Sequence, residues 1–295
     1  KWVDLIEKTD DDDTKEMQKR KNRLSLAHFS VGVCIWELEY QKKEEERDKS
    51  EFTNAAFYIE KAISEETNIL VKLSYMEQLA RFYLVTEEFE KCIEMCNEII
   101  EKDRGFFPAY VHRQKASYEL KDAKGVIDDY FICTEIYPGY AQPYILAAEV
   151  FYAFEQYDDV ENIIKAAKEA GLDSDSLELC RIRSYHYKEF SGENLQQALN
   201  DILKLKKKIE SYKDGEVTDI EDLAMLEKEI AALHWDMENP EKALSVIDQY
   251  LKENPENLKM LNMKVDVLSR EKREKEALEI CNRLVKLDPD NLYTW

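Results

Sequence analysis

The sequence is poor in the residues that interrupt helices. It has seven glycines and six prolines among 295 residues, whereas an average soluble protein carries roughly 12% of the two together. Sheet-rich folds need both residues for their many turns. The scarcity therefore argues against all-β architectures and predicts an almost wholly helical chain.

Long apolar runs and dense cysteine are also missing. No stretch approaches the roughly 18–20 apolar residues of a membrane span, so we expect no membrane partner for this segment. Six cysteines are too few for a disulfide scaffold, which favours free thiols in a reducing cytoplasm. Cys92 and Cys96 lie four apart, but no histidine or second cysteine pair stands near them at zinc-ligand spacing. We expect them to be packed side chains rather than metal ligands.

Basic residues are outnumbered, with 42 Lys and Arg against 63 Asp and Glu and a net charge of −21. Nucleic-acid binding depends on neutralising phosphates with Lys and Arg, so this balance argues against a nucleic-acid partner. The motifs of phosphate-binding loops, dinucleotide folds, zinc proteases and serine hydrolases do not occur. We therefore expect no catalytic residues, no cofactor and no metal.

What the sequence does contain is a period of 34 residues. Pro255 and Pro289 are 34 residues apart and have similar neighbouring residues, and Gly105 and Gly139 have the same separation. A fixed period of about 20–50 residues indicates stacked repeats, in which each unit is one supersecondary element.

At this period the sequence resembles the tetratricopeptide repeat, a helix–turn–helix unit of about 34 residues. The family pattern has a large residue at position 4, small residues at 8, 20 and 27, aromatic residues at 11 and 24, and proline at 32. Residues 107–140 place Tyr110, Tyr130, Cys133 and Pro138 at positions 4, 24, 27 and 32. One such unit cannot bury its own apolar stripe, so neighbours must stack.

Five units of this kind run in two blocks. Three are in phase from 73 to 174 and two from 224 to 291. Some residues depart from the pattern: Gln114 and Val265 stand at the small position 8. His234 takes the core position 11, where an aromatic residue is usual, so we expect a packed histidine there rather than a catalytic one.

The resemblance implies an all-α, right-handed superhelical solenoid of about seven hairpins. It also divides the chain into six segments: 1–23, an acidic and basic lead-in; 24–72, a divergent first repeat with extended helices; 73–174, three in-phase units; 175–223, an extended irregular repeat and linker; 224–291, two in-phase units; and 292–295, the start of a truncated further repeat.

The irregular segments carry their own expectations. Gly32 takes the small position of the first repeat, and residues 41–51 are expected to add helical turns that project into solvent. Asp219 is a candidate N-cap for the helix that follows it. The acidic run at 10–13 and the basic segment at 15–23 read as a solvated helix start, with a docking site as the alternative.

Stacked hairpins line an inner groove with their first helices. In the family the groove-facing positions are chiefly 2, 5, 9, 12 and 13, with 6 contributing. The resemblance thereby implies fourteen ligand-groove candidates: Arg81, Val111, His112, Lys115, Tyr118, Gln142, Ile145, Glu149, Tyr152, Lys228, Trp235, Lys259, Asn262 and Asp266. Exposed aromatic residues beside charges suit a peptide groove, and capping of neighbouring helices is the alternative.

These features predict a non-catalytic scaffold that binds an extended peptide or a partner helix in the groove. The carboxylate clamp, with which tetratricopeptide co-chaperones hold acidic C-terminal tails, is missing in every register. Nucleic-acid-reading helical repeats use a 35-residue period and basic grooves, which this chain lacks. The alternative is a regulatory or targeting segment of a larger multidomain protein, an enzyme or a J-type co-chaperone, whose active part lies elsewhere.

The C-terminal end carries a separate expectation. Trp295 falls at position 4 of a further repeat, as if the chain stopped inside it. Leu268, Ala277 and Ile280 would then lie on an uncovered stacking face. We expect this face to seek cover, with self-association through the C-terminal end.

Overall fold

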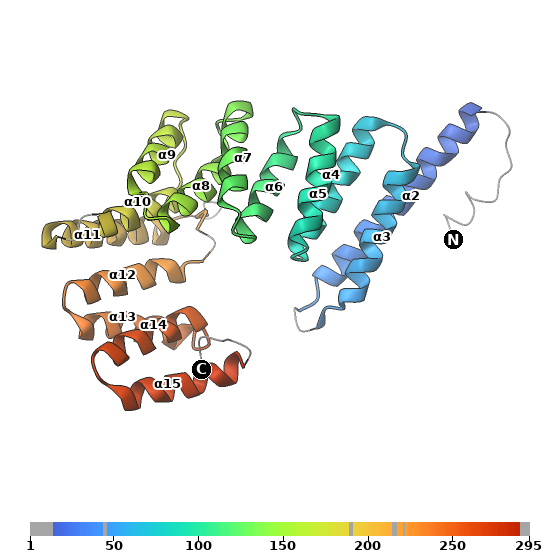
Figure 1. The fold of residues 1–295 in the computed structure, drawn as a ribbon. Helices are drawn as coiled ribbons and strands as arrows, with labels where there is room; N and C mark the ends of the chain where they lie inside the picture. Colours follow the sequence, from blue (N-terminus) through green and yellow to red (C-terminus); the bar gives the residue numbers. More distant parts are fainter. Residues whose placement is uncertain (1–13, 44–45, 189–190, 214–216, 221, 290–295) are drawn as a thin grey trace. The chain divides into compact units, whose positions relative to one another are not determined.

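The computed structural model describes residues 14–43, 46–188, 191–213, 217–220 and 222–289 (Figure 1). Within these ranges the chain forms fourteen α-helices and no β-strand. The all-helical prediction is therefore confirmed. The chain divides into two compact units, Lys1–Leu146 and Ala147–Trp295, with the boundary inside one helix.

The described helices follow one another as seven hairpins, in line with the expected number. Their bounds are α2 (Thr14–Tyr40) with α3 (Lys49–Glu65), α4 (Ile69–Val85) with α5 (Phe89–Lys102), α6 (Phe107–Glu119) with α7 (Ala123–Ile136), α8 (Ala141–Ala153) with α9 (Tyr157–Glu169), α10 (Asp175–Lys188) with α11 (Gly192–Glu210), α12 (Ala224–Asp236) with α13 (Pro240–Glu253), and α14 (Leu258–Arg270) with α15 (Glu274–Leu287).

The apolar pattern positions form the cores of both units. In the first unit, Ala80 of α4 and Cys92 and Cys96 of α5 are fully buried. In the second unit, Ala231 of α12 and Ala243 of α13 are buried in the same way. Small side chains at these positions let the two helices of a hairpin approach closely. The cysteine pair is thus packed in the core, as the sequence predicts.

The backbone repeats the 34-residue period at the turn inside five of the seven hairpins. Five residues other than glycine adopt a left-handed conformation: Glu87, Lys121, Glu155, Glu238 and Lys272. Each lies just after a first helix, and the next residue donates its backbone N–H back into that helix, as Glu88 does to the Tyr83 carbonyl at 2.8 Å. This is the Schellman arrangement that ends a helix by satisfying its last carbonyls.

Gln114 stands at a position where the pattern asks for a small residue, and the structure shows how it fits. Its side chain is fully buried. The amide Nε2 donates to the carbonyl of Val126 at 3.1 Å and to that of Pro143 at 3.2 Å. The larger residue therefore joins α6 to α7 and to the start of α8.

α2 and α3 approach each other closely at Gly32 of α2. A Cβ there would stand 2.7 Å from the Ala55 carbonyl oxygen and 2.7 Å from Ile59 Cγ1 on α3. The segment that joins these helices differs from the prediction. Residues 41–48 form no added helical turns where the structure describes them; instead Arg47 donates to the carbonyls of Lys42 and Tyr40. These bonds satisfy the last carbonyl of α2 and one just beyond it, and so compete with continuation of the helix.

The linker before α12 also departs from the prediction. Asp219 does not cap α12, which begins only at Ala224. Its carboxylate accepts from the Ser176 backbone N–H at 2.9 Å, and its carbonyl accepts from the Ser176 hydroxyl at 2.8 Å. Asp219 therefore ties the linker to the start of α10. The first N–H groups of a helix have no partner inside it, so the linker carboxylate can accept from one of them at the start of α10.

The C-terminal hairpin corrects the expected exposed face. Leu268 and Ala277 are 1% and 6% exposed and pack with α12 and α13 in one core, and Ile280 packs against that core. Leu268 of α14 and Ala277 and Ile280 of α15 thus face the preceding hairpin. Residues 292–295, with Trp295, lie outside the described ranges.

The first prediction concerns Gly32. We expect Gly32→Ala to lower the free energy of unfolding by about 1–2 kcal/mol, because overpacking outweighs the gain of about 1 kcal/mol in helix propensity. Urea unfolding followed by circular dichroism measures the change. Gly192→Ala is the matched control, since nothing lies within 4 Å of a Cβ at that first residue of α11. Equal stability of the two variants would contradict the close approach.

The second prediction concerns pH and the start of α10. Asp175 accepts from the Tyr212 hydroxyl at 2.7 Å and pairs with Lys208 at 3.0 Å. Burial acts to raise its pKa, but bonds from Tyr212, Lys208 and Thr218 hold the pKa below the ordinary 3.8. A carboxyl with a lowered folded pKa stabilises the fold above its unfolded pKa and loses that effect as pH falls through the folded pKa.

We therefore expect Asp175→Asn to cost about 1–2 kcal/mol at pH 7, and the difference from wild type to shrink below about pH 4. Unfolding in urea at a series of pH values tests this. Asp173→Asn, whose side chain is 87% exposed, should change stability at pH 7 by less than about 0.5 kcal/mol. A difference that stays constant down to pH 2 would refute the assignment.

Candidate functional site

The predicted groove residues all lie on first helices, and the structure divides them between the two compact units. The first unit holds seven of them: Arg81, Val111, His112, Lys115, Tyr118, Gln142 and Ile145. The second unit holds the other seven: Glu149, Tyr152, Lys228, Trp235, Lys259, Asn262 and Asp266. Each set is described within its own unit.

In the first unit, the predicted residues make contacts with their neighbours. His112 Nε2 lies 2.8 Å from Glu77 Oε1, and both side chains are partly exposed. The Lys121 ammonium lies 5.2 Å from the centre of the Tyr118 ring. Arg81 is exposed on α4. The role of this set in ligand binding stays a prediction.

In the second unit, five predicted residues come together in one cavity of about 500 Å³. We call it the first-helix cavity, because α10, α12 and α14 line it. Its predicted members are Lys228, Trp235, Lys259, Asn262 and Asp266, and its other members are Tyr187, Ala232, Asp236, Met263, Val267 and Arg270. Both apolar and charged side chains thus line this one cavity.

The charges around the cavity differ in how they are satisfied. The Lys259 ammonium lies 2.7 Å from Asp222 Oδ2. Burial acts to raise the pKa of Asp222, but Lys259 and the Ala224 backbone N–H hold it below 3.8. The Arg270 guanidinium lies 5.9 Å from the centre of the Trp235 ring, a distance at which a cation and an aromatic face attract. Lys228 and Asp266 are exposed to solvent.

A buried histidine supports the wall of the cavity. His186 of α10 is fully buried, with Nδ1 2.6 Å from Glu229 Oε1 and Nε2 3.0 Å from Asp236 Oδ2, both on α12. Its ring also stacks on Tyr187 at 4.2 Å between centroids. His186 therefore fixes α10 against α12 and sets the position of Tyr187.

Glu149 and Tyr152 are held by a residue that the sequence prediction missed. Arg183 Nη1 lies 3.0 Å from Glu149 Oε1, and the Arg183 guanidinium lies 4.1 Å from the centre of the Tyr152 ring. Burial acts to lower the pKa of Arg183, yet the carboxylate of Glu149 and its other acidic neighbours leave it raised. This arrangement joins α8 to α10 and places Tyr152 within 6.2 Å of Tyr187.

The sequence did hold a signal for the missed residues. Counting the 34-residue register on from 141–174 places Arg183 at position 9 and Tyr187 at position 13 of a unit that begins at 175. Both are groove positions. The irregular spacing of 175–223 concealed this, because the extra residues enter after α10, in the long α11 and the linker.

Within the described ranges, no group of three or more His, Cys, Asp or Glu side chains is arranged to hold a metal ion. None of the helices that the structure describes combines the length and the apolar character that a membrane crossing requires.

Comparison with known proteins agrees with this architecture. Residues 258–291 match the family model of the tetratricopeptide repeat. A tetratricopeptide repeat protein from Parabacteroides merdae has a similar structure, with a TM-score of 0.70 at 11% identity over 91% of this chain and 96% of that one. The chain has the tetratricopeptide-repeat fold. The resemblance predicted from the sequence is confirmed by both findings.

Two further tetratricopeptide-type structures match over nearly the whole chain. A chain of the APC/C hetero-tetramer Cut9–Hcn1 gives a TM-score of 0.61 at 10% identity, covering 99% of this chain and 57% of its own length. Yeast Tom70 gives 0.55 at 16% identity, covering 97% of this chain and 54% of its own. This chain thus spans little more than half the length of these two proteins. No curated protein sequence matches the chain significantly.

The third prediction tests whether His186 supports the wall of the first-helix cavity. We expect Glu229→Ala to lower the free energy of unfolding by about 2–3 kcal/mol, because it leaves the buried His186 without one of its two acceptors. Asp266→Ala removes an exposed carboxylate from the same cavity and should cost less than about 0.5 kcal/mol. Thermal and urea unfolding of both variants measure this. If the two variants were equally stable, His186 would not be holding α10 to α12.

Proposed function

We propose that this chain binds a protein partner by holding an extended segment or a helix of it in the first-helix cavity. One observation carries the proposal: five residues assigned to groove positions from the sequence line one cavity in the second unit. They stand on two successive first helices, α12 and α14, and Tyr187 of α10 joins them. A ligand that follows this row of helices would meet all of them.

The chemistry of the lining supports a peptide ligand. Trp235, Tyr187 and Met263 offer apolar surface that an inserted side chain covers, and Trp and Tyr dominate the energetics of many protein interfaces. The Asn262 amide both donates and accepts, as a peptide backbone does. Lys228 and Asp266 are exposed charges of opposite sign. They would favour ligand residues of the complementary charge beside the inserted side chain.

Binding is proposed in place of catalysis. Three acidic groups around the cavity are engaged and a fourth, Asp266, is exposed to solvent: Asp222 pairs with Lys259, and Asp236 and Glu229 bind His186. These bonds hold helices together and leave no poised acid–base pair around the cavity among the described side chains. The proposed role is therefore a non-catalytic scaffold, in the cytoplasm, where six free thiols are compatible with a reducing environment.

The structural neighbours support protein binding in general terms. The Cut9–Hcn1 assembly is a hetero-tetramer of two kinds of chain, so a chain of this fold assembles there with other chains. The alternative is a regulatory or targeting segment of a longer protein. Under it the same cavity would bind a domain of the same polypeptide rather than a separate partner.

The fourth prediction tests the cavity with an immobilised library of random twelve-residue peptides. We expect the wild-type chain to bind a subset, and Trp235→Ala with Asn262→Ala to weaken that binding at least about tenfold, since a buried aromatic anchor contributes about 2 kcal/mol or more. Fluorescence anisotropy of selected peptides measures the affinity.

Phe131→Ala with Asn282→Ala is the matched control. It removes an aromatic residue that is 62% exposed and an exposed asparagine, both on second helices. Circular dichroism confirms that both double variants are folded. Equal weakening in the two double variants, or none in the first, would place the ligand elsewhere.

A further inference from the structure

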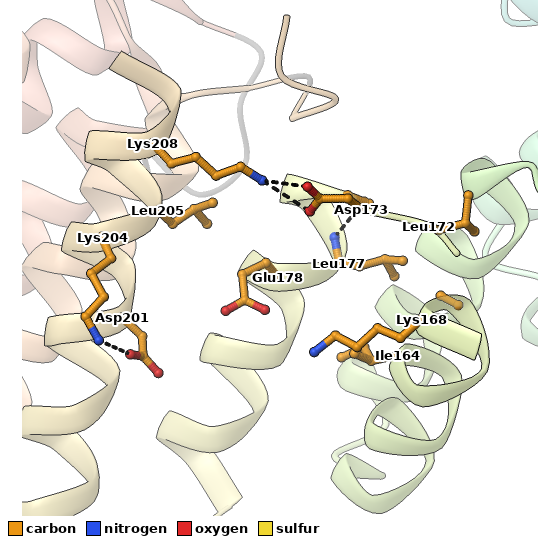
Figure 2. Close-up of a pocket in the computed structure, with 12 residues that line it drawn as sticks. Ile164, Lys168, Leu172, Asp173, Leu177, Glu178, Asp201, Lys204, Leu205 and Lys208 are labelled. Carbon is orange, nitrogen blue, oxygen red and sulfur yellow. Dashed lines mark hydrogen bonds and ion pairs between the residues drawn. The ribbon is translucent and has the colours of Figure 1, made fainter. Parts of the chain in front are cut away.

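A second hollow lies in the second unit, away from the first-helix cavity. It has a volume of about 440 Å³ and opens between the second helices α9 and α11, with the start of α10 between them (Figure 2). We call it the second-helix groove and define it by Ile164 and Lys168 of α9, Leu177 and Glu178 of α10, and Leu205 and Lys208 of α11. None of its lining residues lines the first-helix cavity.

The length of α11 shapes this groove. α11 has 19 residues, whereas the second helices α9 and α13 have 13 and 14. The extra turn at the C-terminal end of α11 carries Lys208, whose ammonium reaches Asp173 of the 172–174 connection. The irregular repeat, which the tetratricopeptide pattern does not explain, thereby builds a hollow on the side of the second helices.

The floor of the groove is apolar. Leu177 and Leu205 are each 4% exposed, and Ile164 has the same exposure, so all three present only part of their surface to the hollow. The groove continues along α9 into an adjoining hollow of about 480 Å³ that shares Ile164 and Lys168. From Glu161 to Glu169 the lining of the two hollows follows α9 for about two turns, or roughly 12 Å.

The groove lining carries three carboxylates and three ammonium groups, which are not paired one to one. Glu178 and Asp201 both bind Arg181, at 2.8 and 2.9 Å, and Asp201 also binds Lys204 at 3.2 Å. Asp173 binds Lys208 at 3.2 Å. Every carboxylate of the groove lining is thus bonded to a cation of the same unit.

Lys168 is different. It has no hydrogen-bond or ion-pair partner among the residues that the structure describes. Figure 2 shows its ammonium end directed from α9 toward the middle of the groove, with no dashed line to it. An uncompensated cation above an apolar floor attracts a carboxylate that arrives beside an apolar side chain.

We propose that the second-helix groove is a second docking site, which binds an acidic segment of a partner protein. An apolar side chain of that segment covers Ile164, Leu177 and Leu205, and a neighbouring Asp or Glu pairs with Lys168. The net charge of −21 does not prevent this, because salt screens charges beyond about 8–10 Å and the local pair remains. Two sites on different helix sets let the chain hold two partners at once.

A defined peptide tests the site. The probe is a twelve-residue synthetic peptide in which leucine pairs alternate with glutamate pairs, with a glutamine-for-glutamate peptide of the same pattern beside it. Methyl NMR of the full chain is expected to show shifts at Ile164, Leu177 and Leu205 with the glutamate peptide. The glutamine peptide should bind at least about fivefold more weakly. Absence of these shifts at millimolar peptide would overturn the proposal.

A charge reversal then tests the role of Lys168. We expect Lys168→Glu to weaken the glutamate peptide at least about fivefold, whereas Lys275→Glu, the same charge change at an exposed position on α15, leaves the affinity unchanged. The double variant Trp235→Ala with Asn262→Ala should leave peptide binding at the second-helix groove intact. A wrong proposal for this groove can therefore be told apart from a wrong proposal for the first-helix cavity. Equal weakening by both lysine variants, or the same methyl shifts on concentrating the chain without peptide, would refute the proposed partner.

Discussion

No hairpin of this chain can bury its own apolar stripe, and the rest of the structure depends on that constraint. Helices of 13 or 14 residues are marginal in water when alone. Their stability comes from close contact, first inside the hairpin and then between hairpins. Small side chains from both helices of a hairpin share each core, Ala80 and Cys92 in one and Ala231 and Ala243 in another. Gly32 is the extreme case, since even a methyl group does not fit there.

In five of the seven hairpins the inner turn is held by hydrogen bonds at a residue other than glycine. The left-handed positions are Glu87, Lys121 and Glu155 in one block and Glu238 and Lys272 in the other. A residue with a Cβ pays about 1 kcal/mol or more in that conformation. The returning N–H bonds and the stacking of the hairpin offset this cost. The period is therefore present in the backbone even where the sequence pattern is weak, as at 224–257.

The sequence predicted the helical class, the hairpins and most core positions, because a 34-residue period constrains every unit in the same way. The sequence-based prediction was wrong where a contact between residues apart in the sequence determines the local structure. Asp219 looks like an N-cap from its neighbours alone, yet it bonds Ser176, 43 residues away. The segment after Tyr40 looks helical in composition, yet Arg47 bonds the last carbonyl of α2. Leu268 was placed on an open face because the pattern does not say that α12 and α13 cover it.

The groove positions show the same limit within a single register. Glu149 and Asp266 both stand at position 9, and both are acidic. Glu149 is bonded by Arg183, which lies 34 residues on at the next position 9, whereas Asp266 faces solvent. The repeat position alone therefore does not distinguish a residue that contacts a ligand from one that bonds to the next repeat. The residue 34 positions away determines which of the two it is. Where that residue is complementary, the pair joins first helices and little of its charge is left for a ligand. Affinity in the first-helix cavity must then come from apolar contact with Trp235 and Tyr187, with the exposed charges setting selectivity.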